Sequence, residues 1–186
     1  MCGYGLSNST VGIIGLGRIG MAIAQRLKPF GVKTFLYTGR QPRPERAAGV
    51  NAEYVSCEKL TEDSDFVVVS CSLTPETEGL CNKDFFSRMK KTSVFINISR
   101  ADKERLRRSR GVKTRKGRHG MKIGGTGADL RHPSNQTAAA PPLVILPHIG
   151  SATYSTRNTM AILAVNNLLK GLAEEDMPSE LKIGPT

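Results

Sequence analysis

The stretch VGIIGLGRIG, residues 11–20, decides the fold that this sequence predicts. It joins a short apolar run to glycines in the spacing G-x-G-x-x-G, at Gly15, Gly17 and Gly20. In this spacing the first glycine permits a tight turn out of a strand, the second lets the backbone approach a pyrophosphate, and the third allows the next helix to pack closely on the sheet. The helix N-terminus then offers free N–H groups to phosphates. The stretch predicts a dinucleotide-binding β-turn-α unit.

The flanks of the glycines strengthen this prediction. The apolar positions before and after them are Val11, Ile13 and Ile14, then Ile19, Ile23, Ala24 and Leu27. The first set fits a buried strand, and the second set fits the sheet-facing side of an amphipathic helix. Arg18 and Ile19, between the second and third glycines, join the three glycines as predicted cofactor contacts. The alternative is a β-turn-α unit of the same fold that binds no ligand.

Composition and cysteine usage set the broad class. A chain of 186 residues with 39% hydrophobic content can bury one domain core and a fragment of a second. The cysteines show no metal-type spacing and no secretory context, which predicts reduced thiols, a cytoplasmic location and no metal. They are Cys2, Cys57, Cys71 and Cys81. No apolar stretch approaches the ~20 residues of a membrane span, and no leader or address signal is recognisable at either end, so we expect no membrane partner.

The positive charge of the chain is concentrated in one segment. The net charge is +11, and residues 101–131 hold 11 Lys and Arg against 3 Asp and Glu. Such a segment has the electrostatics of a nucleic-acid binder. No aromatic residue interleaves its arginines, however, which disfavours that function and leaves it a remote alternative.

Hydrophobic runs alternate with helical patterns along the chain, as parallel α/β folds require. Further strands are predicted at 32–37, 54–55, 65–70, 93–99 and 143–148, and helices at 83–89 and 156–172. The last helix has an apolar face made by Met160, Leu163, Ala164, Leu168 and Leu172. These elements predict a doubly wound parallel sheet of the Rossmann type.

The predicted domain boundaries follow from this order of elements. Residues 1–150 form the cofactor-binding domain, and residues 151–186 form a helix and tail. Within the domain, residues 101–142 are rich in Arg, Lys and Gly and then in Pro, Ser, Asn and Ala. A segment with so few large apolar residues is expected to be poorly ordered or irregular.

The end of the second strand bears on the choice between the two nicotinamide cofactors. NAD sites usually place an Asp or Glu there for the ribose 2′-hydroxyl. Here Thr38 and Gly39 stand at that place and are followed by Arg40 and Arg43. Two guanidinium groups suit a 2′-phosphate, so we expect NADPH to bind and NADH to bind more weakly. The alternative is a solvated basic turn.

Longer stretches add a resemblance to a known family. They are CGYGL, TVGIIGLGRIG, LYTGRQPRP, CSLTPETEGLCNKDFF, VFINISR, VILPHIGSAT, TRNTM and MPSEL, within residues 2–100 and 143–182. On these stretches, roughly three quarters of the chain, the sequence resembles the NADPH-preferring glyoxylate and hydroxypyruvate reductases among the D-isomer 2-hydroxyacid dehydrogenases. The resemblance implies reduction of a small 2-keto acid, a homodimer, and a C-terminal segment that belongs to the family's substrate domain.

The resemblance also implies roles for individual residues. Arg100 matches the arginine that binds the substrate carboxylate and polarises its keto group, a task that suits a planar cation. His148 matches the histidine that protonates the carbonyl oxygen, and an imidazole titrates near neutral pH. Without the family, these residues would be a surface cation and a structural histidine. Further cofactor contacts are implied at Ser72, Leu73, Thr74, Ile98, Asp129 and Gly150.

The departures from the family pattern predict impaired catalysis. Ser134 occupies the position of the family's catalytic Glu, and the chain has no glutamate between Glu104 and Glu174. A carboxylate beside an imidazole fixes its tautomer and favours its protonated form, so His148 is expected to be a weaker acid-base group. Family members also carry about a hundred residues before the CGYGL stretch, and these help to close the site.

Two interpretations therefore stay open at the level of sequence. One is an NADPH-dependent reductase-like protein with impaired turnover, and the other is a non-catalytic NADP-binding or interaction protein. The departure from the family over 101–142 also suggests a reading-frame or exon error, which sequencing of the transcript would test.

Overall fold

The computed structural model describes residues 3–99, 119–123 and 143–180. The chain divides into two compact units, Met1–His148 and Ile149–Thr186. We describe each unit by itself.

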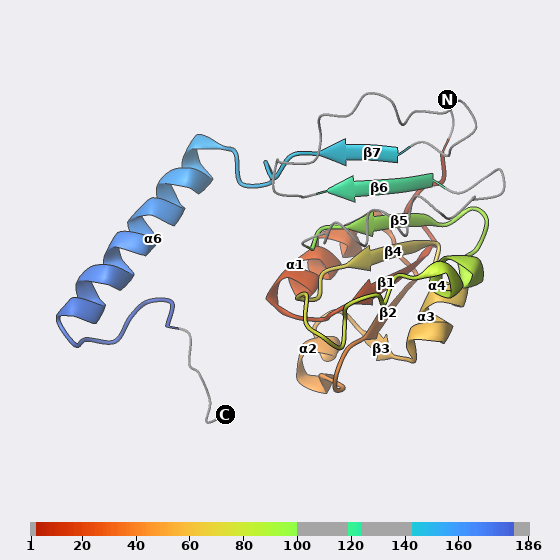
Figure 1. Cartoon of the computed structure of the whole chain (residues 1–186), viewed down its shortest axis with the longest axis horizontal. Coiled ribbons are helices and arrows are strands. Elements are labelled where there is room, and N and C mark those ends of the chain that lie inside the picture. Colours follow the sequence, from red (N-terminus) through yellow and green to blue (C-terminus); the bar gives the residue numbers. More distant parts are fainter. Residues whose placement is uncertain (1–2, 100–118, 124–142, 181–186) are drawn as a thin grey trace. The chain divides into compact units, whose positions relative to one another are not determined.

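A parallel β-sheet forms the first unit (Figure 1). In the described residues it has seven strands in the order β3-β2-β1-β4-β5-β6-β7. Their bounds are β1 Thr10–Ile14, β2 Thr34–Thr38, β3 Ala52–Tyr54, β4 Phe66–Val69, β5 Val94–Asn97, β6 His119–Ile123 and β7 Leu143–Leu146. Every neighbouring pair is parallel, and Val11 of β1 lies opposite Phe35 on one side and Phe66 on the other. The predicted doubly wound Rossmann-type fold is confirmed.

Short helices cover both faces of the sheet. Their bounds are α1 Arg18–Leu27, η1 Lys28–Phe30, α2 Pro44–Ala48, α3 Cys57–Asp63 and α4 Lys83–Arg88. Side-chain caps start two of them: the Ser56 Oγ accepts the Lys59 N–H at 3.2 Å for α3, and the Asn82 Oδ1 accepts the Phe85 N–H at 2.9 Å for α4. Such caps satisfy N–H groups that the helix itself leaves unpaired.

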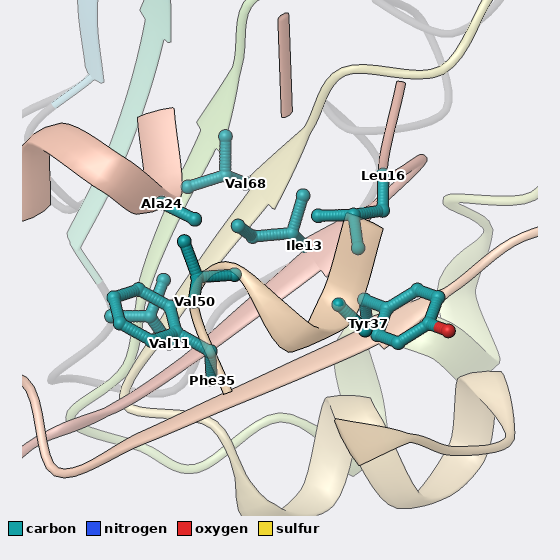
Figure 2. Close-up of a cluster of buried hydrophobic side chains, with 9 residues drawn as sticks. Val11, Ile13, Leu16, Ala24, Phe35, Tyr37, Val50 and Val68 are labelled. Carbon is teal, nitrogen blue, oxygen red and sulfur yellow. The ribbon is translucent and has the colours of Figure 1, made fainter. Parts of the chain in front are cut away.

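One core lies between the sheet and the α1 side (Figure 2). It consists of Val11, Ile13, Leu16, Ala24, Phe35, Tyr37, Ala47, Val50 and Val68, and we call it the α1-side core. Alternate residues of β1, β2 and β4 supply it, because successive side chains of a strand point to opposite faces. The strands are therefore buried from both sides, which explains their nearly continuous apolar sequence.

The opposite face carries the second core, which we call the α3-side core. It consists of Ile14, Leu36, Val55, Leu60, Val67, Val69, Cys81, Phe85 and Met89. Leu60 from α3 is fully buried in it. Three phenylalanines extend it with edge-to-face ring contacts, at centroid distances of 5.0–6.0 Å among Phe85, Phe86 and Phe95. Helices thus pack on both faces, which defines the doubly wound arrangement.

The predicted strands agree with the observed ones to within two or three residues, with one omission. β6, His119–Ile123, lies within the segment expected to be irregular, yet it pairs with β5 and β7. Its sequence HGMKI lacks the aliphatic run that identified the other strands, and the parallel partners on both sides supply its hydrogen bonds. The remainder of 101–142 lies outside the described residues.

One prediction about α1 is wrong. Ile23, Ala24 and Leu27 face the α1-side core as expected, but Ile19 is 61% exposed. Ile19 lies in the first turn of α1, next to the glycine loop. The helical spacing of apolar residues does not show which part of the helix packs on the sheet.

The second unit is built on one long helix, α6, Tyr154–Leu172. The Thr153 Oγ1 caps it by accepting the Thr156 N–H at 3.3 Å, and the Asn167 Oδ1 accepts the Ser179 N–H of the following segment at 3.0 Å. No residue of α6 is buried, so within the described residues nothing covers the apolar side chains that were predicted to form one face of this helix. Among the helices that the structure describes, none has the length and hydrophobicity needed to cross a membrane.

Candidate cofactor site

The glycine loop leaves the carboxyl end of β1 and enters α1. Gly15 has a φ of +97°, a conformation that L side chains rarely adopt. A Cβ at this position would lie 2.8 Å from the Cys71 backbone. Gly20 is also closely packed, because a Cβ added at this position would lie against the Gly15 carbonyl oxygen. These two glycines therefore serve the turn and the close packing of the helix, as the motif predicts.

Gly17 differs from its two neighbours in the motif. A Cβ added there would meet nothing within 4 Å, and its φ is −82°. The local backbone therefore gives no steric reason for glycine. Gly17 is also the N-cap of α1, and in the described chain no side chain caps this helix start. The space and the uncapped N–H groups suit an anionic ligand that approaches the backbone.

Hydrogen bonds from the neighbouring strands hold the loop in place. The Gly15 N–H donates to the Thr38 carbonyl at 2.9 Å, and the Ser70 N–H donates to the Ile14 carbonyl at 2.9 Å. The Ser70 hydroxyl donates to the Gly15 carbonyl at 2.8 Å. The loop is therefore fixed by the ends of both β2 and β4. Sequence analysis did not identify Ser70, whose only signal is a small polar residue at the end of a buried strand.

The arginine turn, residues 39–43, leaves the carboxyl end of β2. Arg40 and Arg43 are exposed in it. In α2, which follows, the Arg46 guanidinium donates to the Leu16 carbonyl of the glycine loop at 3.3 Å. The structure thus brings the arginine turn and the glycine loop to the same edge of the sheet. Arg46 was not predicted, since a single arginine in a helix carries no sequence signal.

The third element of this edge is the loop after β4. It contains Ser72, Leu73 and Thr74, and Thr77 organises it. The Thr77 hydroxyl accepts the Thr74 N–H and donates to the Ser72 carbonyl, both at 2.8 Å. A hydrogen bond with Thr74 and, more weakly, the positive charge of Arg40 lower the pKa of the exposed Glu76 carboxyl. This loop therefore has a defined geometry and lies near the arginine turn.

The end of β5 completes the described part of the edge. The Ile98 N–H donates to the Val69 carbonyl at 3.1 Å, and Ile98 packs on the α1-side core. The buried Asn97 amide accepts both the N–H and the hydroxyl of Ser99, at 3.0 and 2.8 Å, and so closes the turn after the strand. Asn97 is a positioning residue that the sequence did not reveal.

Several predicted site residues are not brought into this arrangement. Arg100, Asp129 and Ser134 lie outside the described residues. His148 is exposed after β7 at the end of the first unit, and Gly150 belongs to the second unit. The structure thus brings part of the predicted cofactor contacts to one edge of the sheet, and the catalytic residues, Asp129 and Gly150 stay predictions.

The carboxyl edge of the sheet is a switch point of the fold. From β1 the chain continues to α1 on one face, whereas from β4 it continues to α4 on the other. In open α/β sheets, ligands bind in the crevice that such a reversal creates at the carboxyl ends of the strands. The open Gly17, the uncapped α1 and the nearby arginine turn together fit the pyrophosphate and ribose of a dinucleotide.

Metal and thiol chemistry is not apparent at this edge. Within the described residues, no three His, Cys, Asp or Glu side chains lie together as metal ligands. The Cys57 thiol is free. Burial raises the pKa of the Cys57 thiol, with a smaller contribution from Glu58 and against an opposing hydrogen bond with Thr61. Cys57 is therefore poorly suited to act as a nucleophile.

Comparisons with known proteins agree with this site. Residues 1–105 match the family described as D-isomer specific 2-hydroxyacid dehydrogenase, NAD binding domain. The chain is 60% identical to the human glyoxylate reductase/hydroxypyruvate reductase and 59% identical to the mouse protein of that name, over 98% of its own length in each case. It spans 56% of the length of each relative.

A solved structure supports the same assignment of fold. The crystal structure of the TT0316 protein from Thermus thermophilus superposes with a TM-score of 0.77 and 33% sequence identity. The match covers 97% of this chain and 56% of that one. The similarity therefore concerns about half of the larger protein, the half that contains the Rossmann-type sheet.

Proposed function

Because the chain belongs to the D-isomer specific 2-hydroxyacid dehydrogenase family, we propose that its first unit binds NADPH in preference to NADH at the carboxyl edge of the sheet. The observation that carries the proposal is the glycine loop. Gly15 and Gly20 are required by the fold, whereas Gly17 leaves open space in front of an uncapped helix start. Arg18 and Ile19 in the first turn of α1 complete the predicted contacts with the pyrophosphate.

The arginine turn supports the preference for NADPH. Arg40 and Arg43 follow β2, where an acid would bind the 2′-hydroxyl of NADH, and no acid stands there. Guanidinium groups bind phosphate through charge-assisted hydrogen bonds. The resemblance places Asp129 near the nicotinamide carboxamide, and the remaining predicted cofactor contacts are Ser72, Leu73, Thr74, Ile98 and Gly150.

The proposed reaction class is reduction of a small 2-keto acid such as glyoxylate or hydroxypyruvate. The bound cofactor would supply a hydride equivalent. Arg100 would bind the substrate carboxylate, and His148 would donate a proton to the keto oxygen. Ser134 stands where the family has its Glu, so the sequence lacks the carboxylate that the family pattern pairs with this histidine. We therefore propose that turnover is close to background.

A second candidate function is non-catalytic NADP binding. The observation that favours it is the absence of glutamate between Glu104 and Glu174 in the sequence, which contrasts with the complete glycine loop. Both functions use the same cofactor contacts. A homodimer belongs to the proposal by family resemblance, and a cytoplasmic location belongs to it because the cysteine spacing suits reduced thiols.

Cofactor binding can be followed directly in this chain. It contains no tryptophan, so the fluorescence of NADPH and NADH can be titrated without energy transfer from indole. We expect NADPH to bind more tightly than NADH. Replacing Arg40 and Arg43 together by Ala should remove the difference, since each charged hydrogen bond contributes at most about 1.5–3 kcal/mol. Equal affinities in the unmodified chain would refute the cofactor preference.

Turnover tests the proposed loss of catalysis. Steady-state NADPH oxidation with glyoxylate should stay near background in the parent, His148→Ala and Arg100→Ala proteins alike. Rates of about 1 to 10³ per second in the parent, abolished by both substitutions, would show that the chain is a working reductase.

A further inference from the structure

The arginine turn is exposed, and a tyrosine at the end of a neighbouring strand anchors each of its ends. Its residues, 39–43, lie between β2 and α2 and are all exposed to solvent. If nothing held it, an exposed turn of this length would sample many conformations. Fixing it in one conformation when a phosphate binds would then cost conformational entropy and weaken the binding. The position of Arg40 and Arg43 therefore depends on what holds the backbone of the turn.

Tyr37 holds the end of the turn. This residue of β2 is 2% exposed and belongs to the α1-side core. Figure 2 shows its ring at the edge of that core, with the hydroxyl directed away from the other labelled side chains. The hydroxyl oxygen accepts the backbone N–H of Arg43 at 2.8 Å. A core side chain thus fixes the backbone of an arginine that would bind phosphate.

Tyr54 holds the beginning of the turn. This last residue of β3 lies directly opposite Tyr37 in the register of β2 and β3. The two rings meet edge to face, with centroids 5.2 Å apart and an interplanar angle of 63°. The Tyr54 hydroxyl donates to the Gly39 carbonyl at 3.1 Å. The paired rings therefore place one hydroxyl at each end of the turn.

We propose that the pair Tyr37 and Tyr54 positions Arg40 and Arg43 for a 2′-phosphate and so contributes to the preference for NADPH over NADH. This inference rests on the proposed function. The two tyrosines act through the backbone of the turn and are positioning residues. The Arg46 hydrogen bond to the Leu16 carbonyl also links α2, which follows the turn, to the glycine loop.

The chemistry of the pair makes the inference testable without disturbing the core. Tyr54→Phe and Tyr37→Phe remove one hydroxyl each and keep the rings that pack on each other. A structural role alone would weaken NADPH and NADH equally, because both cofactors share the pyrophosphate and adenosine contacts. A positioning role for the arginines would weaken NADPH selectively. Tyr154→Phe is the matched control, since Tyr154 is 94% exposed on α6.

The experiment measures dissociation constants of NADPH and NADH by nucleotide fluorescence for the full chain and these three variants. Amide hydrogen exchange at Arg43 in the absence of nucleotide reports the anchoring of the turn. Each variant of the tyrosine pair should lower the NADPH affinity by about two- to tenfold, the range expected for one hydrogen bond. NADH affinity should stay within about twofold of the parent, and Tyr37→Phe should speed exchange at the Arg43 amide.

The outcomes separate this inference from the function on which it rests. If the parent prefers NADPH and both variants keep that preference, or lose both affinities by the same factor, the inference is overturned and the proposed function stands. If the parent binds the two cofactors equally, the cofactor preference and the inference are both overturned. Selective loss of NADPH affinity in Tyr54→Phe, which leaves the buried tyrosine intact, would support both.

Discussion

Helices α1 and α6 have apolar residues at similar helical spacing but very different surroundings. α1 places Ala24 in the α1-side core, with Ile23 and Leu27 packed against it. α6 is nearly twice as long and has no buried residue, and Leu168 and Leu172 are 62% and 75% exposed. The periodic pattern identified both helices correctly. It does not show which surface, if any, covers them.

The difference lies in what the rest of each unit provides. In the first unit, parallel strands present apolar side chains on two faces, and each helix that follows a strand covers part of one face. In the described part of the second unit, no sheet accompanies α6. The stability of the chain should therefore depend on the first unit far more than on the second.

The largest expected effect comes from truncating one leucine in each unit. Leu60→Ala would leave a cavity in the α3-side core and should lower the free energy of unfolding by about 2–5 kcal/mol. Leu168→Ala on α6 should change it by less than about 0.5 kcal/mol, as is usual for exposed sites. Urea unfolding followed by far-ultraviolet circular dichroism would compare the two. Similar losses would mean that α6 is covered in solution.

A second prediction concerns the turn that starts the cofactor site. Gly15→Ala adds a Cβ at a φ of +97° and 2.8 Å from the Cys71 backbone. We expect a loss of about 2–4 kcal/mol in the free energy of unfolding, from backbone strain and overpacking together. Gly150→Ala, in the second unit, meets nothing within 4 Å and serves as the control. Unchanged thermal stability of Gly15→Ala would contradict the conformation of the loop.

A smaller effect is expected at the opposite edge of the sheet. The Asp65 carboxylate accepts the Thr10 N–H at 2.9 Å and the Lys90 ammonium at 2.8 Å. Burial acts to raise the pKa of Asp65, but these two hydrogen bonds and the Lys90 charge outweigh it, so the pKa is lowered. Asp65→Asn should cost about 1 kcal/mol at neutral pH, because the pair is partly exposed and screened.

The contribution of Asp65 to stability should depend on pH, and its lowered pKa sets the direction. A carboxyl whose pKa is lower in the folded state stabilises the fold above its ordinary pKa of about 3.9. This contribution is lost as the pH falls through the lower pKa of the folded state. The stability difference between the parent and Asp65→Asn should therefore shrink from pH 7 to pH 3 in urea titrations. A difference that stayed constant would argue against a lowered pKa.

The sequence predicted most of the first unit because local and global signals agree there. The glycine motif predicted a strand, a turn and a helix in that order. The continuous valines Val67 to Val69 identified a strand that is buried on both faces. β6 was missed because the sequence HGMKI is polar, and its partners lie far away in the sequence. Ile19 was placed on the wrong side because the position of the sheet edge is a tertiary property.

The sequence predicted which residues contribute to the cofactor site. The structure adds the hydrogen bonds that position these residues. Gly15, Gly17, Arg40 and Arg43 could be identified because a motif or an absent acid marks them. Tyr54, Ser70 and Thr77 act through hydrogen bonds to carbonyl or amide groups of neighbouring loops. Their partners are brought together by the sheet register, which no local pattern encodes.

Gly17 tests most directly whether the glycine loop binds a dinucleotide. Gly17→Ala adds a Cβ where nothing lies within 4 Å, so the free energy of unfolding should change by no more than about 1 kcal/mol, the usual effect at an N-cap. The account predicts that NADPH affinity, measured by nucleotide fluorescence on the full chain, falls at least about tenfold, because the methyl group occupies the approach of the pyrophosphate. NADPH affinity equal to that of the parent, in a variant of unchanged stability, would contradict it.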